Sequence, residues 1–511
     1  MKKMFFISVI SVSLLIVTAG CSPERIPATD WEIVSEKAEV PDTPREMRAV
    51  WIATVSNIDW PSEPGLSTAQ QKAELRALFD RMKMLNMNTV IFQVRPATDA
   101  FYDSRFEPWS EYLTGEQGKA PDPYYDPLEF AIDEAHKRGL ELHAWLNPFR
   151  ARHSSAASEM HEMHLSEKQP FLIRNYGTHL WMDPGHPKAV DWSVEVVKDI
   201  VRRYAVDGIH FDDYFYPYKE YDENDNLIDF PDSSTYAAYI EEYGEIQRND
   251  WRRQNVDHFI ERTYHEIKNV DPKVRFGISP IGLWRPDHQG DEIWGFDAYE
   301  EIYADSRKWF NEGWVDYFTP QLYWPADQDG QRYKTLIEWW HHQNGKSRHF
   351  WPGNYTSRTA FGADPWTASE ISKQIQITRD FSGTGGNVHF SMRVLMMNPD
   401  GLLDELMNLY HTPALVPASA WLYESPPQKP EAAVHYLNSR YQLDFKPAKG
   451  EEVWLYVVKV RYEKTWETFI IPGWKQHISL DPVLDNKSIN RIAVSTVNRT
   501  GLESDAVVFV Y

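Results

Sequence analysis

The sequence has little of three things: cysteine, positive charge and long apolar runs. Its one cysteine, Cys21, excludes a disulfide bond within the chain. The 53 Lys and Arg residues are outnumbered by 75 Asp and Glu residues, and the net charge of −22 argues against a nucleic-acid partner, whose phosphates require a basic surface. After residue 20, no stretch approaches the ~20 apolar residues that a transmembrane helix needs. The hydrophobic fraction of 42% is that of an ordinary globular chain.

The N-terminus has the pattern of a secretory signal. Two lysines precede an apolar run over residues 5–17, and small residues follow. The site at Cys21 is similar to a bacterial lipobox, in which the cysteine is lipidated and becomes the new N-terminus, although Thr18 stands where Leu is usual. A plain signal peptide cut near Ala19 and a short membrane anchor are the alternatives. We therefore predict a signal peptide over residues 1–20 and a cell-envelope lipoprotein anchored through Cys21, on a membrane face that the sequence leaves open.

The middle of the chain predicts a (β/α)8 TIM barrel. Residues 21–44 are polar and contain proline, which is typical of a tether. Over residues 45–413, short apolar runs alternate with helical patterns, which favours a parallel barrel over an open sheet. The eight predicted strands are Arg48–Thr54, Thr89–Arg95, Glu141–Leu146, Gly208–Phe211, Arg275–Ser279, Tyr317–Leu322, His349–Gly353 and Val388–Met392. One of the predicted helices between them spans Tyr299–Asn311.

The tail changes character after Pro413. Several prolines mark a hinge, and strand-like alternation then continues without a helical period. Residues 421–511 are therefore predicted to form a small all-β domain, a fibronectin type III-like β-sandwich. We expect a structural or sugar-contacting accessory rather than a catalytic unit.

Aromatic residues are abundant, with 21 Trp, 27 Tyr and 24 Phe. Sugar rings present flat C–H faces on which aromatic rings stack, although many of these side chains must fill the core. In a barrel of this type the active site lies at the C-terminal ends of the strands. Polar and aromatic residues converge there, and they predict a glycan-binding rim made of Gln93, Arg95, His143, Trp145, Asn147, Tyr214, Gln321, Tyr323, Trp324 and Arg393.

Asp212, at the end of the fourth predicted strand, is the first candidate for catalysis. A carboxylate there can stabilise an oxocarbenium-like transition state, as a nucleophile or as an electrostatic partner. Asp213 cannot point the same way if the strand stays extended, so a supporting role is expected for it. The alternative for the pair is a helix cap or an ion pair with Arg95 or Arg150.

Hydrolysis usually needs a second carboxyl group, and the fifth and sixth strands end without one. Glu111 is our candidate, because its aromatic surroundings would raise the pKa of a general acid; an ordinary surface loop residue is an equal alternative. Further loop candidates are Asp99, Asp103, Asp183 and Asp297. Metalloprotease, nucleophile-elbow, phosphate-loop and dinucleotide patterns are missing, so we expect neither a cofactor nor a metal.

Several long motifs resemble those of glycosyl-hydrolase-like family ten, a group of bacterial barrel proteins that are often lipoproteins. The resemblance spans residues 46–410 and rests on Arg48-Ala-Val-Trp-Ile-Ala-Thr-Val-Ser56, Asn88-Thr-Val-Ile-Phe-Gln-Val-Arg95-Pro96, Asp133-Glu-Ala-His-Lys-Arg-Gly139, His143-Ala-Trp-Leu-Asn147-Pro148, Asp207-Gly-Ile-His-Phe-Asp212-Asp213-Tyr214-Phe-Tyr216 and Asp250-Trp-Arg-Arg-Gln-Asn255.

This resemblance implies a TIM barrel that acts on bacterial glycans, with relatives that cleave peptidoglycan strands once the stem peptides are removed. A more distant similarity to the alpha-amylase superfamily implies that Asp212 is the nucleophile and that Asn147 ends the third strand of the site. The superfamily's acid has no counterpart, since Ser279-Pro280 stands in its place. The main prediction is a glycoside hydrolase, and the alternative is a catalytically silent glycan-binding surface lipoprotein.

Overall fold

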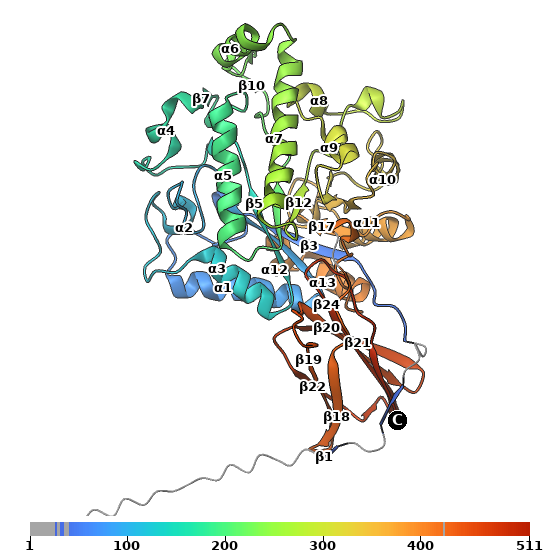
Figure 1. The fold of residues 1–511 in the computed structure, drawn as a ribbon. Helices are drawn as coiled ribbons and strands as arrows, with labels where there is room; N and C mark the ends of the chain where they lie inside the picture. Colours follow the sequence, from blue (N-terminus) through green and yellow to red (C-terminus); the bar gives the residue numbers. More distant parts are fainter. Residues whose placement is uncertain (1–25, 28–30, 35–39, 423–424) are drawn as a thin grey trace, which may run out of the picture.

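The computed structural model describes residues 26–27, 31–34, 40–422 and 425–511, and its larger part is a parallel barrel (Figure 1). Each strand pairs in parallel with the next, and the last pairs with the first. This closed order confirms the predicted barrel. The strands are β3 (Met47–Ile52), β4 (Thr89–Arg95), β5 (Glu141–Leu146), β9 (Gly208–Phe211), β12 (Arg275–Ile278), β13 and β14 (Tyr317–Phe318, Gln321–Leu322), β15 and β16 (His349–Phe350, Gly353–Asn354) and β17 (Gly386–His389).

Helices surround the barrel, and their ends follow local capping chemistry. The side chain of Ser67 and that of Gln70 form a reciprocal capping box at the first helix, and Asp126 caps the helix that begins at Pro127. The helix predicted over residues 299–311 is instead divided into α8 (Ala298–Glu301) and α9 (Ser306–Glu312). The other principal helices are α1 (Thr68–Met84), α3 (Pro127–Lys137), α5 (Pro187–Arg203), α7 (Arg248–Val270), α10 (Tyr333–His342), α11 (Ala368–Asp380), α12 (Met392–Met397) and α13 (Leu402–Leu409).

Additional segments stand above the C-terminal ends of the strands. The sequence did not predict α6 (Ser233–Tyr243), which lies beside the upper part of α7 and buries none of its residues (Figure 1). The remaining segments on this side are α2 (Glu111–Thr114), β6 (Arg150–Arg152), α4 (Leu165–Lys168), β7 (Ile173–Tyr176), β8 (His179–Met182), β10 (Glu220–Tyr221) and β11 (Leu227–Ile228).

A polar chain runs through the barrel interior. The hydroxyl of Tyr317 lies 2.9 Å from Nδ1 of His143 and 3.0 Å from Nδ1 of His210. The indole N–H of Trp51 donates to Nε2 of His210 at 3.1 Å, so the His210 proton resides on Nδ1 and is donated to Tyr317. Tyr317 then donates to His143, whose Nε2 faces the Glu141 carboxylate at 3.4 Å. These groups are all buried, and each satisfies the next.

The C-terminal residues form a two-sheet antiparallel domain, which confirms the predicted all-β tail. One sheet holds β18 (Glu431–Leu437), β19 (Arg440–Lys446) and β22 (His477–Leu480). The other holds β21 (Thr465–Pro472), β20 (Leu455–Tyr462), β24 (Lys487–Val497) and β25 (Val507–Val510), with β23 (Val483–Leu484) at its margin.

The predicted tether contributes strands to this domain. Within residues 21–44, β1 (Ile26–Pro27) pairs with β18, and β2 (Glu32–Val34) pairs with β25. The segment therefore extends both sheets, because each outer strand offers unpaired backbone groups. Cys21 and the predicted signal peptide lie outside the described residues. Within the described ranges, no helix is long and apolar enough to cross a membrane.

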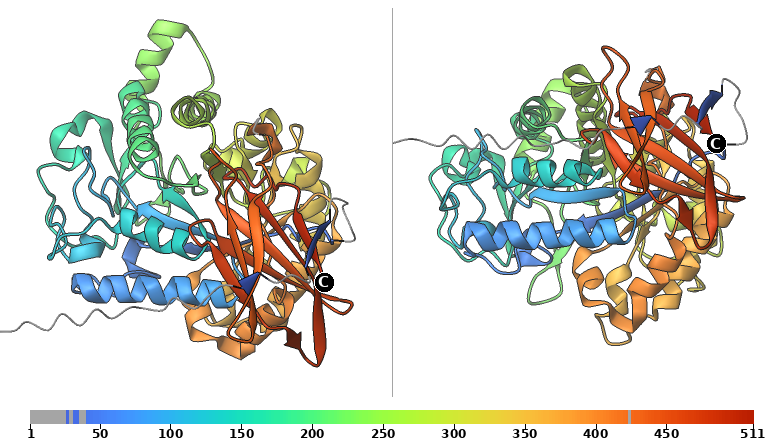
Figure 2. Two further views of the ribbon diagram at one scale, coloured as in Figure 1. Left: turned by 60° about the horizontal axis from the view of Figure 1, so that its bottom comes forward. Right: turned by 90° about the horizontal axis from the view of Figure 1, so that it is seen from below.

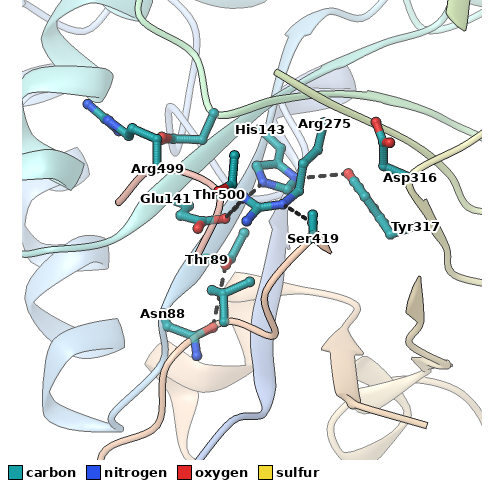
Figure 3. Close-up of polar contacts among 12 residues, drawn as sticks. Asn88, Thr89, Glu141, His143, Arg275, Asp316, Tyr317, Ser419, Arg499 and Thr500 are labelled. Carbon is teal, nitrogen blue, oxygen red and sulfur yellow. Dashed lines mark hydrogen bonds and ion pairs between the residues drawn. The ribbon is translucent and has the colours of Figure 1, made fainter. Parts of the chain in front are cut away.

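The sandwich covers the N-terminal end of the barrel, opposite the predicted active site (Figures 1 and 2). Arg275, at the start of β12, donates to the hydroxyl of Ser419 at 3.0 Å and pairs with Glu141 at 2.8 Å (Figure 3). The indole N–H of Trp421 donates to Asp316 at 2.8 Å. Because these partners begin the strands rather than end them, the sandwich has a structural position and does not line the C-terminal rim.

A charged cluster at this interface makes stability depend on pH. Asp207 is buried, which by itself would raise its pKa, but Arg499 and His136 outweigh burial and hold the pKa below its ordinary value. Since the folded pKa lies below the unfolded value of about 3.9, the pair stabilises the fold above that pH. The stabilisation is lost as the pH falls through the folded pKa.

Replacement of Arg499 by methionine is expected to lower the free energy of unfolding by about 1–2 kcal/mol at pH 7. This is less than a fully buried pair would contribute, because the arginine side chain is 37% exposed. The loss should shrink between pH 5 and pH 2, as measured by urea unfolding with tryptophan fluorescence. Arg202→Met is the matched control, since its contact with Glu195 is long and exposed. An Arg499→Met loss that is constant over this pH range would contradict the assignment.

Candidate active site

Asp212 lies directly after β9, where the strand ends at the C-terminal face of the barrel. Its carboxylate accepts from Nδ2 of Asn147 at 3.1 Å and from Nε2 of Gln321 at 3.4 Å. The backbone N–H of Asp213 donates to it at 3.0 Å. Three donors from three positions in the barrel therefore fix the orientation of this carboxylate.

The amide groups around Asp212 have one consistent orientation. The backbone N–H groups of Thr54 and Val55 both donate to Oε1 of Gln93 at 2.9 Å, so the other end of this amide is its NH2 group. That group donates to Oδ1 of Asn147 at 2.7 Å, which turns Nδ2 of Asn147 toward Asp212. The first strand thus orients a carboxylate on the fourth through two intervening side chains.

Asp213 differs from the prediction. Because β9 ends at Phe211, the backbone bends, and the Asp213 side chain lies within hydrogen-bond reach of the Asp212 carboxylate instead of pointing away. The hydroxyl of Tyr218 also donates to Asp213. Burial and the charge of Asp212 raise the pKa of the Asp213 carboxyl well above its ordinary value. Asp213 therefore keeps its proton to a higher pH than an ordinary aspartic acid does.

Aromatic residues gather near the pair. Tyr323 stacks on Tyr355 with ring centroids 4.8 Å apart and lies 6.1 Å from Phe390. Burial, together with the charges of Asp212 and Asp213, raises the pKa of the Tyr323 hydroxyl, which places this tyrosine close to both carboxyl groups. Tyr214 directly follows Asp213, and its hydroxyl accepts from Arg150. The arrangement offers flat apolar surfaces beside two acids, as a sugar site requires.

Three residues predicted to bind substrate are buried inside the barrel. Arg95 is fully buried, and its guanidinium forms an ion pair with Glu107 at 2.6 Å and donates to the backbone oxygen of Asn147. His143 is likewise fully buried and belongs to the interior polar chain below the site. Trp145 is 5% exposed and packs with core tryptophans. Their positions along the strands indicate that these side chains point into the barrel, but not how far below the rim they lie.

The remaining predicted residues are spread along the rim. Glu111 is buried, and its carboxylate accepts from the backbone N–H groups of Ala157 and Ser158 at 2.7 and 2.8 Å, so it holds a loop. Trp324 is partly buried against the core. Arg393 is exposed, and its guanidinium lies 5.4 Å from the ring centre of Phe361.

Substitution of Gln93 tests the amide relay. Gln93→Leu leaves two buried N–H groups unpaired, and we expect a loss of about 1–3 kcal/mol in stability. Turnover should fall on the order of 10²-fold, since Asn147 is no longer oriented. Gln93→Glu keeps the acceptor for both N–H groups but turns Asn147 away from Asp212. It should therefore lose turnover while retaining more stability, as measured by thermal unfolding and release of reducing ends. Full turnover in Gln93→Glu would contradict the relay.

Sequence reasoning missed Tyr218 and Phe390. Tyr218 lies six positions after Asp212, in the run that follows β9, and it contacts Asp213 only because that run folds back. Phe390 follows β17, where the pattern indicated a longer strand. Across the described part of the chain, no group of three or more His, Cys, Asp or Glu side chains could hold a metal ion.

Comparison with known proteins adds family evidence. The family model described as glycosyl hydrolase-like 10 matches residues 46–351. Glycosyl hydrolase YngK of Bacillus subtilis (strain 168) is 42% identical over 397 residues, which cover 76% of this chain and 76% of that protein. Glycosyl hydrolase DigH of Escherichia coli (strain K12) is 36% identical over 351 residues, or 65% of this chain and 77% of that protein.

Among solved structures, the PgaB (BpsB) glycoside hydrolase domain from Bordetella bronchiseptica is 16% identical. The match covers 71% of this chain and 99% of that one, with a TM-score of 0.47. The fold assigned to the present chain rests on its own strand order.

Proposed function

The chain belongs to the glycosyl hydrolase-like 10 family, and from this premise we propose that it hydrolyses glycosidic bonds of a complex bacterial glycan. The glycan strands of peptidoglycan are the first candidate substrate. One observation carries the proposal: Asp212 is oriented by Asn147 and Gln321 beside Asp213, whose pKa burial and the Asp212 charge raise. A charged carboxylate next to a protonated one supplies both electrostatic stabilisation and a proton.

The surroundings of Asp212 favour an enzyme over a silent glycan-binding protein. A carboxylate that served only structure would be expected to pair with arginine or lysine. The side chains that donate to Asp212 are instead neutral amides, and Arg150 is directed to Tyr214 and Asn147. Neutral partners leave the negative charge available to a developing oxocarbenium ion.

The test is release of reducing ends from a panel of glycans by the purified protein. The panel holds peptidoglycan strands freed of stem peptides, together with plant and capsular glycans. The Asp212→Asn/Asp213→Asn double variant is the control for contaminating hydrolases. We expect release by the wild type and none by the double variant. Binding to these glycans without release by either protein would favour the silent alternative.

Three further properties belong to the proposal. Lipidation at Cys21 would hold the protein to a membrane of the cell envelope, as the signal-like N-terminus suggests. The sandwich would have the fibronectin type III layout, which its division into three-stranded and four-stranded sheets supports once the added N-terminal strands and the two-residue strand β23 are set aside. Its contacts with the N-terminal end of the barrel suggest a structural role.

A further inference from the structure

The spacing of the two catalytic candidates restricts the mechanism. Asp212 and Asp213 are consecutive, and their carboxyl groups are within hydrogen-bond reach. A retaining glycosidase with an enzyme nucleophile needs its two carboxyl groups about 5–5.5 Å apart, and an inverting one needs about 6.5–9.5 Å. Groups that contact each other cannot act on opposite faces of one sugar ring. The pair can therefore supply a proton, from Asp213, and a negative charge, from Asp212, on one side of the sugar ring.

Other carboxyl groups near the rim are engaged by the fold. Asp59 accepts from the backbone N–H groups of Ala53 and Arg393 and from the hydroxyl of Ser391, each at 2.7 Å. Asp99 accepts from the N–H of Ala97 and from Ser110.

Two glutamates are equally occupied, Glu107 by Arg95 and Glu111 by the backbone of residues 157–158. The carboxylates of Asp59, Asp99, Glu107 and Glu111 therefore bind groups of the fold and are not free to attack the sugar.

We propose that the nucleophile comes from the substrate, as the carbonyl oxygen of a 2-acetamido group, so that the site is specific for 2-acetamido-2-deoxy sugars. This inference rests on the proposed hydrolase function. Asp212 is suited to accept a hydrogen bond from the acetamido N–H, because it is held by neutral amides. The aromatic surface of Tyr323, Tyr355 and Phe390 is suited to the acetamido methyl group.

The reaction balances with groups on this side of the sugar alone. Asp213 gives its proton to the glycosidic oxygen, and the C1–O bond breaks with its electron pair leaving on that oxygen. The acetamido oxygen forms a bond to C1, and Asp212 stabilises the positive charge of the resulting oxazolinium ring. Water then attacks C1 and gives a proton to Asp213, while the bond between C1 and the acetamido oxygen breaks and the acetamido group is restored. Two displacements at C1 leave the anomeric configuration retained.

The deciding experiment compares one glycan with and without its acetyl groups. Peptidoglycan strands freed of stem peptides are incubated with the wild-type protein before and after chemical N-deacetylation, and the new reducing ends are counted. We expect cleavage of the deacetylated strands to be on the order of 10³-fold slower or absent, since an intramolecular nucleophile has been removed. Proton NMR of the first products should show retention.

Each other outcome has a definite meaning. Equal cleavage of deacetylated strands, cleavage of glycans that lack acetamido groups, or inversion at C1 would overturn the inference while leaving a hydrolase. If the deacetylated strands were cleaved more slowly only because they bind more weakly, KM would rise and kcat would be unchanged. Loss of the nucleophile lowers kcat instead. Failure to cleave any glycan in the panel would overturn the proposed function and the inference together.

Discussion

Asp212→Asn is expected to reduce turnover by on the order of 10³-fold or more while the protein remains folded. The carboxylate is the one charged acceptor to which Asn147, Gln321 and the Asp213 N–H all donate. Asparagine keeps one oxygen for these donors but has no charge with which to stabilise a cationic intermediate. The stability cost should be about 1 kcal/mol, because most of the hydrogen bonds are retained.

This variant also reports on its neighbour. The charge of Asp212 contributes to the raised pKa of Asp213, so its removal should move the ionisation of Asp213 to lower pH. The alkaline limb of the residual activity should shift in the same direction. Asp222→Asn is the matched control, because Asp222 is an exposed turn residue that accepts from Asn224 and Asn226. Undiminished release of reducing ends by Asp212→Asn would contradict the assignment of this carboxylate.

The barrel could be predicted because its determinants are local. Apolar runs such as 89–95 and 141–146 begin and end where the strands do, since each is bounded by polar or turn-forming residues. The helix over residues 299–311 failed for an equally local reason. Asp305 caps a new helix at Ser306, so the pattern that continues in sequence is interrupted in the backbone.

The site could be predicted only in part. The alternation of side chains along a strand does not show how deeply a residue is buried or where the loop after the strand folds back. Gln93, Asn147 and Gln321 were identified from the ends of their strands. Asn147 and Gln321 donate to Asp212 directly, and Gln93 orients Asn147. Arg95 and His143 share that inward direction but lie in ion-pair and interior networks. The contact of Asp213 with Asp212 arises from a bend after Phe211, which strand periodicity cannot anticipate.

Asp213→Asn should produce a loss that depends on the leaving group. A sugar alkoxide must be protonated to depart, so turnover of the natural glycan should fall on the order of 10³-fold. A nitrophenyl glycoside of the same sugar needs no proton, and its bond cleavage should fall by roughly 10-fold or less. Wild-type activity requires protonated Asp213, so it is present below the raised pKa and is lost as the pH rises through that value. The variant should lack this alkaline limb.

The Tyr218→Phe variant tests the role of Asp213 as the proton donor, because it changes the pKa of Asp213 and keeps the Asp213 side chain. The Tyr218 hydroxyl stabilises ionised Asp213 and so lowers its pKa against the effects of burial and Asp212. Removing the hydroxyl should move the alkaline limb of the activity profile to higher pH with only a modest loss of turnover.

The Asp213→Asn variant should keep its stability at pH 7, because asparagine cannot become a second buried negative charge beside Asp212. An equal loss on natural and nitrophenyl substrates would show that Asp213 positions the sugar and that the proton comes from elsewhere.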